Sequence, residues 1–143
     1  MSEVTEALKQ LLPDLDKADV TVAIEDHQDA DSDTLLEICE RVGSHVGITL
    51  DTGNPLAVGE DPVEFARNVL PYIADVHLKD YRMITTREGY RLTHVAIGDG
   101  VVDFESIWRL LAHRPALPRS IEMASWNNRH VRLLTDDWWA GFG

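Results

Sequence analysis

Short strand-like segments alternate with longer segments of helical periodicity along this chain, and this order constrains the fold more than any other feature. The strand-like segments lie at residues 20–24, 46–50, 74–78 and 120–123. Short runs rich in β-branched and apolar residues are typical of strands buried in a parallel sheet. Repeated alternation of strand and helix therefore predicts an α/β domain, with helices packed on a parallel sheet.

The helical segments carry recognisable start and stop signals. The first is expected over residues 3–15, and the second is capped by Ser32 or Asp33 and ends near Gly43. Two more are expected over residues 61–72, with Pro62 at the first helical position, and 103–111. The segment 83–96 predicts a hairpin with its tip at 87–89, and a polar, helix-like tail follows the last strand. Since no linker or low-complexity stretch interrupts this order, we expect one domain over residues 1–143.

Composition excludes several classes of protein. The chain has 143 residues and a formal net charge of −12, which argues against a nucleic-acid binder because nucleic acid is held mainly by Lys and Arg. No apolar run approaches the roughly 20 residues of a membrane helix, so we expect no membrane partner. The N-terminal segment lacks the basic start and apolar stretch of a signal peptide, and we expect a cytoplasmic protein. The single cysteine, Cys39, lies in an apolar helical pattern and is expected to be a core thiol.

An acidic or imidazole residue stands at or near the C-terminal end of each predicted strand. These residues are Glu25, Asp51, His77 and Glu122. The first three are spaced by 26 residues, one strand–helix unit each, and the hairpin accounts for the longer last step of 45 residues. Sites of parallel α/β folds form at the C-terminal ends of strands, and neighbouring strands lie about 4.8 Å apart. The four side chains can therefore converge.

Converging carboxylates repel one another, and a bound divalent cation removes that repulsion. Oxygen-rich ligation with one imidazole suits Mn, Mg or Co, with Zn as a further option. Taken singly, Asp51 is also a good turn residue and His77 a plausible hydrogen-bonded core histidine, while Glu25 and Glu122 suit a solvated rim. The recurrence in four successive units favours a metal site.

Several segments together resemble one known family. They are residues 24–27 (IEDH), 50–54 (LDTGN), 76–80 (VHLKD), 97–104 (IGDGVVDF) and 121–123 (IEM). They are similar to the xylose-isomerase-like TIM-barrel superfamily, which contains sugar isomerases and epimerases, inosose dehydratases and abasic-site endonucleases. The resemblance covers about residues 5–125. It implies a partial (β/α)₈ barrel, with strands five to eight and thus the C-terminal half only.

The resemblance also implies a chemistry. Glu25, Asp51, His77 and Glu122 would hold one divalent metal, and Glu25 and Glu122 would act as the acid/base pair of a sugar or sugar-phosphate isomerase or epimerase. One glutamate would take a proton from the carbon next to a carbonyl, and the other would return one to a metal-stabilised enediolate. Two alternatives stay open: a dehydratase acting on a cyclic polyol or keto acid, and a non-catalytic half-barrel subunit or remnant.

Five further residues are candidates for substrate binding. Asn54 stands where many members carry a histidine, and Arg82 lies near the place of a substrate-binding arginine. The others are His27, Lys79 and Trp126. Each has a structural alternative: a turn for Asn54, solvation for Arg82, an inter-loop salt bridge for Lys79, the rim for His27 and core packing for Trp126. Since the chain has neither a GxGxxG motif nor a P-loop, we expect no nucleotide cofactor.

A complete barrel of this kind takes about 250 residues, and only four strands are predicted here. An isolated half would leave two unpaired sheet edges and an apolar inner face in water. We therefore expect a homodimer, or a partner that supplies the missing half-barrel, rather than a stable monomer. The expected ligand is a small polyhydroxylated substrate.

Overall fold

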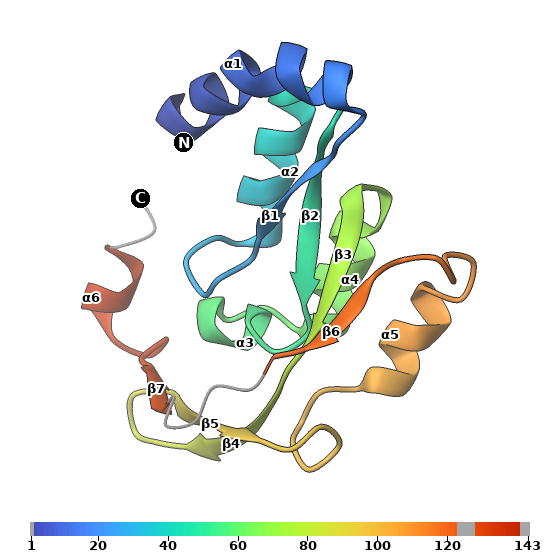
Figure 1. Ribbon diagram of the computed structural model, residues 1–143. Coiled ribbons are helices and arrows are strands. Elements are labelled where there is room, and N and C mark those ends of the chain that lie inside the picture. Colours follow the sequence, from blue (N-terminus) through green and yellow to red (C-terminus); the bar gives the residue numbers. More distant parts are fainter. Residues whose placement is uncertain (1, 123–127, 141–143) are drawn as a thin grey trace.

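A four-stranded parallel sheet forms the centre of the computed structural model, which describes residues 2–122 and 128–140 (Figure 1). The strand order is β1-β2-β3-β6, and the strands are β1 (Val22–Glu25), β2 (Val46–Asp51), β3 (Ile73–Leu78) and β6 (Arg119–Ile121). All three pairings are parallel. The predicted α/β class and the four predicted strands are confirmed.

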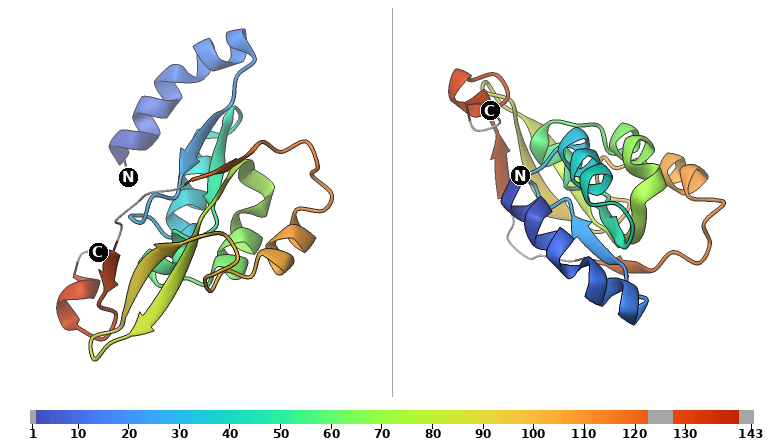
Figure 2. Two further views of the ribbon diagram at one scale, coloured as in Figure 1. Left: turned by 60° about the horizontal axis from the view of Figure 1, so that its bottom comes forward. Right: turned by 90° about the horizontal axis from the view of Figure 1, so that it is seen from above.

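Helices cover one face of this sheet. The helices of the described residues are α1 (Ser2–Ala18), α2 (Ser32–Val42), α3 (Pro55–Val58), α4 (Pro62–Val69), continued by the 3₁₀ turn η1 (Leu70–Tyr72), α5 (Phe104–Leu110) and α6 (Asp136–Trp139). Figure 2 shows α2, α4 and α5 in one layer, while α1 contacts α2 at the end of the sheet where the strands begin. Asp31 caps the N-terminus of α2, and its carboxylate accepts the Thr34 N–H. It lies one residue before Ser32, the first of the two predicted caps. Within the described ranges, no helix is long and apolar enough to span a bilayer.

The hydrophobic core lies between the helical layer and the outer face of the sheet. Its central side chains include Leu35, Ile48, Phe65 and Val76, all at most 1% exposed. Cys39 is fully buried among them, which confirms the predicted core thiol. Burial, with a smaller contribution from the nearby Glu40 charge, raises the pKa of this thiol to about 11, so it stays protonated and poorly nucleophilic at neutral pH.

A second, antiparallel sheet lies at the opposite end, beyond the C-terminal ends of the parallel strands (Figure 1). Its order is β4-β5-β7, with β4 (Asp80–Thr85), β5 (Tyr90–Val95) and β7 (Asn128–Val131). The predicted hairpin is confirmed. The predicted helix-like tail is wrong over residues 128–131, because the free edge of β5 pairs with them in a register that sets Tyr90 opposite Val131 and buries Val131.

The inner face of the parallel sheet is small and polar, which corrects the expectation of an apolar face in water. Side chains alternate along a strand, so Ala23, Thr49 and Asp75 share this face with the residues two positions further on. Gly47 also belongs here, since its neighbours in the strand, Val46 and Ile48, lie in the core on the other face. The larger apolar side chains of these strands face the helices instead.

Candidate metal centre

The four residues predicted from strand spacing meet at one point. Glu25, Asp51, His77 and Glu122 each offer a ligand atom, and these atoms all lie within 4.8 Å of one another. Glu25 and Asp51 end β1 and β2, His77 is the penultimate residue of β3, and Glu122 directly follows β6. Parallel register places them side by side, with Asp51 opposite His77. Three carboxylates and one imidazole at this separation form a donor set that suits a divalent ion.

Asp51 is both a turn residue and a member of the cluster, and each of its two carboxylate oxygens serves one of these roles. Its Oδ1 accepts the backbone N–H groups of Gly53 and Asn54, at 2.9 and 3.0 Å, and so closes the turn after β2. Its Oδ2 faces the cluster and lies 2.7 Å from Lys79 Nζ. The turn therefore orients the carboxylate toward the other three side chains.

His77 stands between the two glutamates. Its Nδ1 lies 3.2 Å from Glu25 Oε1 and 3.4 Å from Glu122 Oε2. Its Nε2 lies 3.4 Å from Asp75 Oδ2 on the same strand. A carboxylate on the far ring nitrogen is a common way to orient a ligating imidazole, and Asp75 occupies that position.

Lys79 places a cation inside the cluster. Its side chain is 2% exposed, and its Nζ lies 2.7 Å from Asp51 Oδ2 and 2.9 Å from Glu122 Oε2. The inter-loop salt bridge considered for Lys79 is thus present, and it ends on two of the candidate metal ligands. An ammonium held between carboxylates shows that the residues gathered here compensate a positive charge. The donor set therefore fits a divalent cation.

The same contacts set the ionisation of the cluster. Burial raises the pKa of Asp51 to about 6, although the Lys79 charge and hydrogen bond act in the opposite direction. For Glu122, burial also acts to raise the pKa, but hydrogen bonds from Lys79 and Asp51 and the charges of Lys79 and His77 outweigh it and lower the value to about 2. Burial acts to lower the pKa of Lys79, but the two carboxylates overcome it and the net pKa is raised. Lys79 is therefore a charged residue at neutral pH.

Sequence reasoning missed a supporting layer behind the cluster. Asp26 is 1% exposed, and its Oδ1 accepts the Asp51 backbone N–H at 2.7 Å, which ties the ends of β1 and β2 together. Gln28 donates its amide to Asn54 Oδ1 at 3.1 Å and to the Tyr81 hydroxyl at 2.9 Å. The sequence signal for Asp26 is its place in the segment 24–27, which carries part of the family resemblance, and Gln28 directly follows that segment.

The structure separates the five predicted substrate-binding residues. Asn54 and Lys79 are buried and contact each other, with Lys79 Nζ 3.3 Å from Asn54 Oδ1. His27 is exposed and lines a cavity beside the cluster, and Arg82 is exposed on β4, with no ion pair among the described side chains. Trp126 lies outside the described residues. Among the candidates that the structure describes, only Asn54 and Lys79 directly contact the quartet formed by Glu25, Asp51, His77 and Glu122.

Comparison with known families agrees with this fold. The family model described as xylose isomerase-like TIM barrel matches residues 1–135. The chain belongs to this family. It is 21% identical over 139 residues to a 3-oxo-isoapionate decarboxylase of Pectobacterium atrosepticum, across 95% of this chain and 46% of that protein. It is 35% identical over 78 residues to an inosose dehydratase of Clostridium botulinum, across 47% of this chain and 26% of that protein.

Solved structures of the family superimpose on this chain. A xylose isomerase domain protein from Planctomyces limnophilus matches with a TM-score of 0.73 and 29% identity, over 85% of this chain and 45% of the other. A xylose isomerase-like TIM barrel protein from Mycobacterium smegmatis, solved in complex with magnesium, matches with a TM-score of 0.74 and 19% identity, over 98% of this chain and 48% of the other. The chain thus spans about half the length of the Pectobacterium atrosepticum decarboxylase and of both solved structures.

Proposed function

We propose that this chain is a divalent-metal-dependent domain that removes a proton from the carbon next to a carbonyl in a small polyhydroxylated substrate. The observation that carries the proposal is the convergence of Glu25, Asp51, His77 and Glu122 within 4.8 Å at the C-terminal edge of the sheet. The magnesium in the Mycobacterium smegmatis protein supports the choice of a hard divalent ion. When bound, such an ion supplies polarisation of the substrate carbonyl.

The residues of this chain supply the proton transfers. Glu25 and Glu122 approach His77 Nδ1 from different strands, and each is partly exposed, so both reach a substrate at the open end of the sheet. One carboxylate takes the proton from carbon, and the other exchanges a proton with a substrate oxygen or with the second face of that carbon. Lys79 and Asn54 are the buried donors beside them and orient substrate hydroxyl groups.

A direct experiment tests the metal site. The purified chain is dialysed against a chelator, titrated with Mn²⁺ or Mg²⁺ by calorimetry, and compared with Glu122→Gln. We expect about one ion per chain, and an affinity at least roughly tenfold weaker in Glu122→Gln, since even loss of a partner of a ligand costs that much. Glu40→Gln, an exposed glutamate on α2, makes the same chemical change away from the site and should bind like the unmodified chain. Equal binding by all three proteins would overturn the site.

Isomerisation, epimerisation and dehydration all begin with the removal of this proton, and they differ in the step that follows. An isomerase or epimerase returns a proton to carbon, whereas a dehydratase expels a hydroxyl group as water. The inosose dehydratases among the relatives favour dehydration. Incubation of the metal-loaded protein with open-chain ketoses and with a cyclic inosose in D₂O distinguishes them by NMR. Deuterium incorporation alone indicates isomerisation or epimerisation. Signals of a dehydrated product, either the enol first formed or the dione with a partly deuterated methylene group to which it tautomerises, indicate dehydration. Neither result with any substrate contradicts turnover by this chain.

We also propose that the sheet is completed by a second copy of this chain or by a partner that supplies the remaining barrel strands. The strands β1 and β6 are the two edges of the described parallel sheet, and all three residues of β6 are exposed. Unpaired edges of this kind readily accept further strands. Added strands at these edges would also enclose the side of the substrate that the quartet leaves open.

A further inference from the structure

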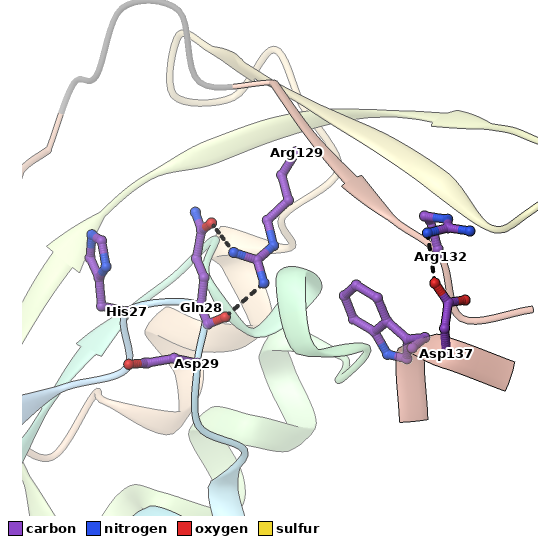
Figure 3. A pocket seen from close by; sticks show the side chains of 7 residues that line it. His27, Gln28, Asp29, Arg129, Arg132 and Asp137 are labelled. Atoms are coloured by element: carbon purple, nitrogen blue, oxygen red, sulfur yellow. Dashed lines mark hydrogen bonds and ion pairs between the residues drawn. The ribbon is translucent and has the colours of Figure 1, made fainter. Parts of the chain in front are cut away.

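A cavity of about 510 Å³ lies beside the quartet, between the loop that follows β1 and the segment formed by β7 and α6. His27, Gln28 and Asp29 line one side, and Arg129, Arg132 and Asp137 line the other (Figure 3). Trp138 of α6 also lines the cavity. Its volume falls in the range of pockets that bind small molecules. His27 is two residues beyond Glu25, and two residues of chain span at most about 7 Å, so the cavity begins next to the proposed metal site.

Arg129 is a half-buried cation in this cavity that no carboxylate neutralises among the described residues. Its two hydrogen bonds end on neutral oxygens of one residue: Nη1 donates to Gln28 Oε1 at 3.2 Å, and Nη2 donates to the Gln28 carbonyl at 3.0 Å. The neighbouring Arg132 differs, because its guanidinium lies 2.9 Å from Asp137 Oδ2 and 3.3 Å from Glu88 Oε2. A guanidinium has five N–H donors, and these two bonds leave three of them for a ligand.

Gln28 holds this guanidinium in a fixed orientation. It is 8% exposed and adopts a positive φ of 68°, a conformation that ordinary side chains rarely adopt. Its amide nitrogen donates to Asn54 and Tyr81, and its amide oxygen is therefore turned toward Arg129. Strain of this kind persists where the surrounding contacts enforce it, and here they orient an arginine toward a cavity.

The same contacts connect the cavity with the quartet. Asn54 Oδ1 accepts from Gln28 and lies 3.3 Å from Lys79 Nζ, which in turn pairs with Asp51 and Glu122. Figure 3 shows the Asp29 carboxylate directed away from the Arg129 guanidinium. Over residues 2–122 and 128–140, no carboxylate pairs with Arg129, so this side of the cavity presents a positive charge in a chain whose formal net charge is −12.

We propose that Arg129 binds the anionic group, a carboxylate or a phosphate monoester, of an acidic polyhydroxylated substrate whose reacting carbon lies at the quartet. The placement of the reacting carbon rests on the function proposed above, whereas anion binding by Arg129 stands on the cavity itself. A planar guanidinium with free N–H donors matches the oxygen geometry of both groups. A neutral sugar would leave this half-buried charge without a partner.

Anion titration of the full chain tests the site without the metal. The ¹⁵N-labelled protein, kept in chelator at constant ionic strength, is titrated with inorganic phosphate, with glycolate and with neutral glycerol, while the Arg129 Nε–H signal is followed by NMR. We expect at least one anion to saturate with a dissociation constant of about 1–10 mM, and glycerol to cause no saturable shift. Saturation by phosphate alone or by glycolate alone assigns the anion class.

Matched variants tie the binding to this arginine. Backbone amide shifts of the cavity residues, followed in the same titrations, should show at least tenfold weaker binding in Arg129→Gln. Arg87→Gln, which removes the same charge at the exposed hairpin tip, should stay within twofold of the unmodified chain. Arg129→Lys keeps the charge without the fork to Gln28 and should lie between the two, which keeps the comparison available if Arg129→Gln does not fold.

Two results would overturn the inference. One is the absence of a saturable shift with either anion in the unmodified chain. The other is an anion affinity of Arg129→Gln and Arg129→Lys equal to that of the unmodified chain. The NMR titrations of the unmodified chain and of the variants are independent of the calorimetric metal titration. Intact metal binding without anion binding contradicts only the Arg129 site, and anion binding without metal binding contradicts only the proposed function.

Discussion

At the scale of single residues, the Lys79 ammonium compensates part of the negative charge of the quartet. Its ammonium lies within 2.9 Å of carboxylate oxygens from both Asp51 and Glu122, and its side chain is almost fully buried. Three carboxylates that converge without a cation would repel one another and take up protons. Lys79 is therefore an internal counter-charge to these carboxylates, and a divalent ion held as proposed above would compete with it for the same oxygens.

Replacement of Lys79 by Met tests this role. Since removal of one partner from a buried ion pair costs about 3 kcal/mol, the melting temperature in chelator should fall by roughly 10 °C for a chain of this size. Added Mn²⁺ should then raise the melting temperature of Lys79→Met more than that of the unmodified chain. Lys9→Met, at an exposed lysine on α1, serves as the control. An unchanged melting temperature of Lys79→Met in chelator would contradict the role.

Cys39 gives a pH-dependent prediction. Its pKa is raised from 9.0 to about 11 in the folded chain, so folding favours the neutral thiol. The stabilisation is therefore fully present below about pH 9 and is lost as the pH rises through about 11. At pH 8, iodoacetamide should label the folded protein far more slowly than the urea-unfolded protein, as mass spectrometry can show. Equal labelling rates would mean that the thiol is accessible in the folded state.

At the scale of elements, Asp80 connects the antiparallel sheet to the loop before α5. Its Oδ1 accepts the N–H groups of Tyr81 and Val102, at 2.9 and 3.2 Å. Its Oδ2 accepts those of Gly98 and Gly100, each at 2.9 Å. The carboxylate is fully buried, and it fixes the first residue of β4 directly after Lys79. The position of Lys79 in the quartet thus depends on this anchor.

Asp80→Asn should therefore be costly although it preserves the shape of the side chain. Its NH₂ group replaces one acceptor oxygen and leaves two backbone N–H donors without that acceptor, at a cost of about 1–3 kcal/mol for each one that is shielded from water. The urea midpoint should fall accordingly, whereas Asp99→Asn, at an exposed aspartate in the same loop, should leave it nearly unchanged. Equal midpoints for the two variants would show that the anchor contributes little.

At the scale of the whole molecule, the β6 edge decides whether the half-barrel associates through its sheet. The Glu122 backbone N–H donates inward to Leu78, and successive N–H groups of a strand alternate in direction, so the Ile121 N–H points outward. Ile121 is also 65% exposed. A strand added at this edge would use that N–H and cover that side chain.

Proline at position 121 removes the outward N–H and is tolerated on an edge strand. Sedimentation of the unmodified chain at micromolar concentration should show a dimer, and Ile121→Pro should shift it toward the monomer. Ile121→Thr keeps the N–H and serves as the matched control, with a smaller shift. A compact monomer in all three proteins would rule out a homodimer through this edge and leave a separate partner to complete the sheet.

Local patterns in the sequence were sufficient to predict the strand–helix order, the hairpin and the four residues of the quartet. Each of these follows from features that repeat along the chain: apolar runs, caps, turns and an acidic or imidazole residue once per unit. Parallel register then brings equivalent positions to one edge of the sheet, so spacing alone predicts their convergence.

Tertiary structure decided the features that join residues far apart in sequence. The strand pairing of residues 128–131 depends on the free edge of β5, which a local pattern does not reveal. Arg129 reaches Gln28, and Lys79 turns into the quartet, only because the two sheets meet at the end of the parallel strands. The amino-acid sequence by itself thus determined which side chains stand at the strand ends. Packing determined which charges compensate them, because those contacts depend on the distances between elements rather than on the order of residues.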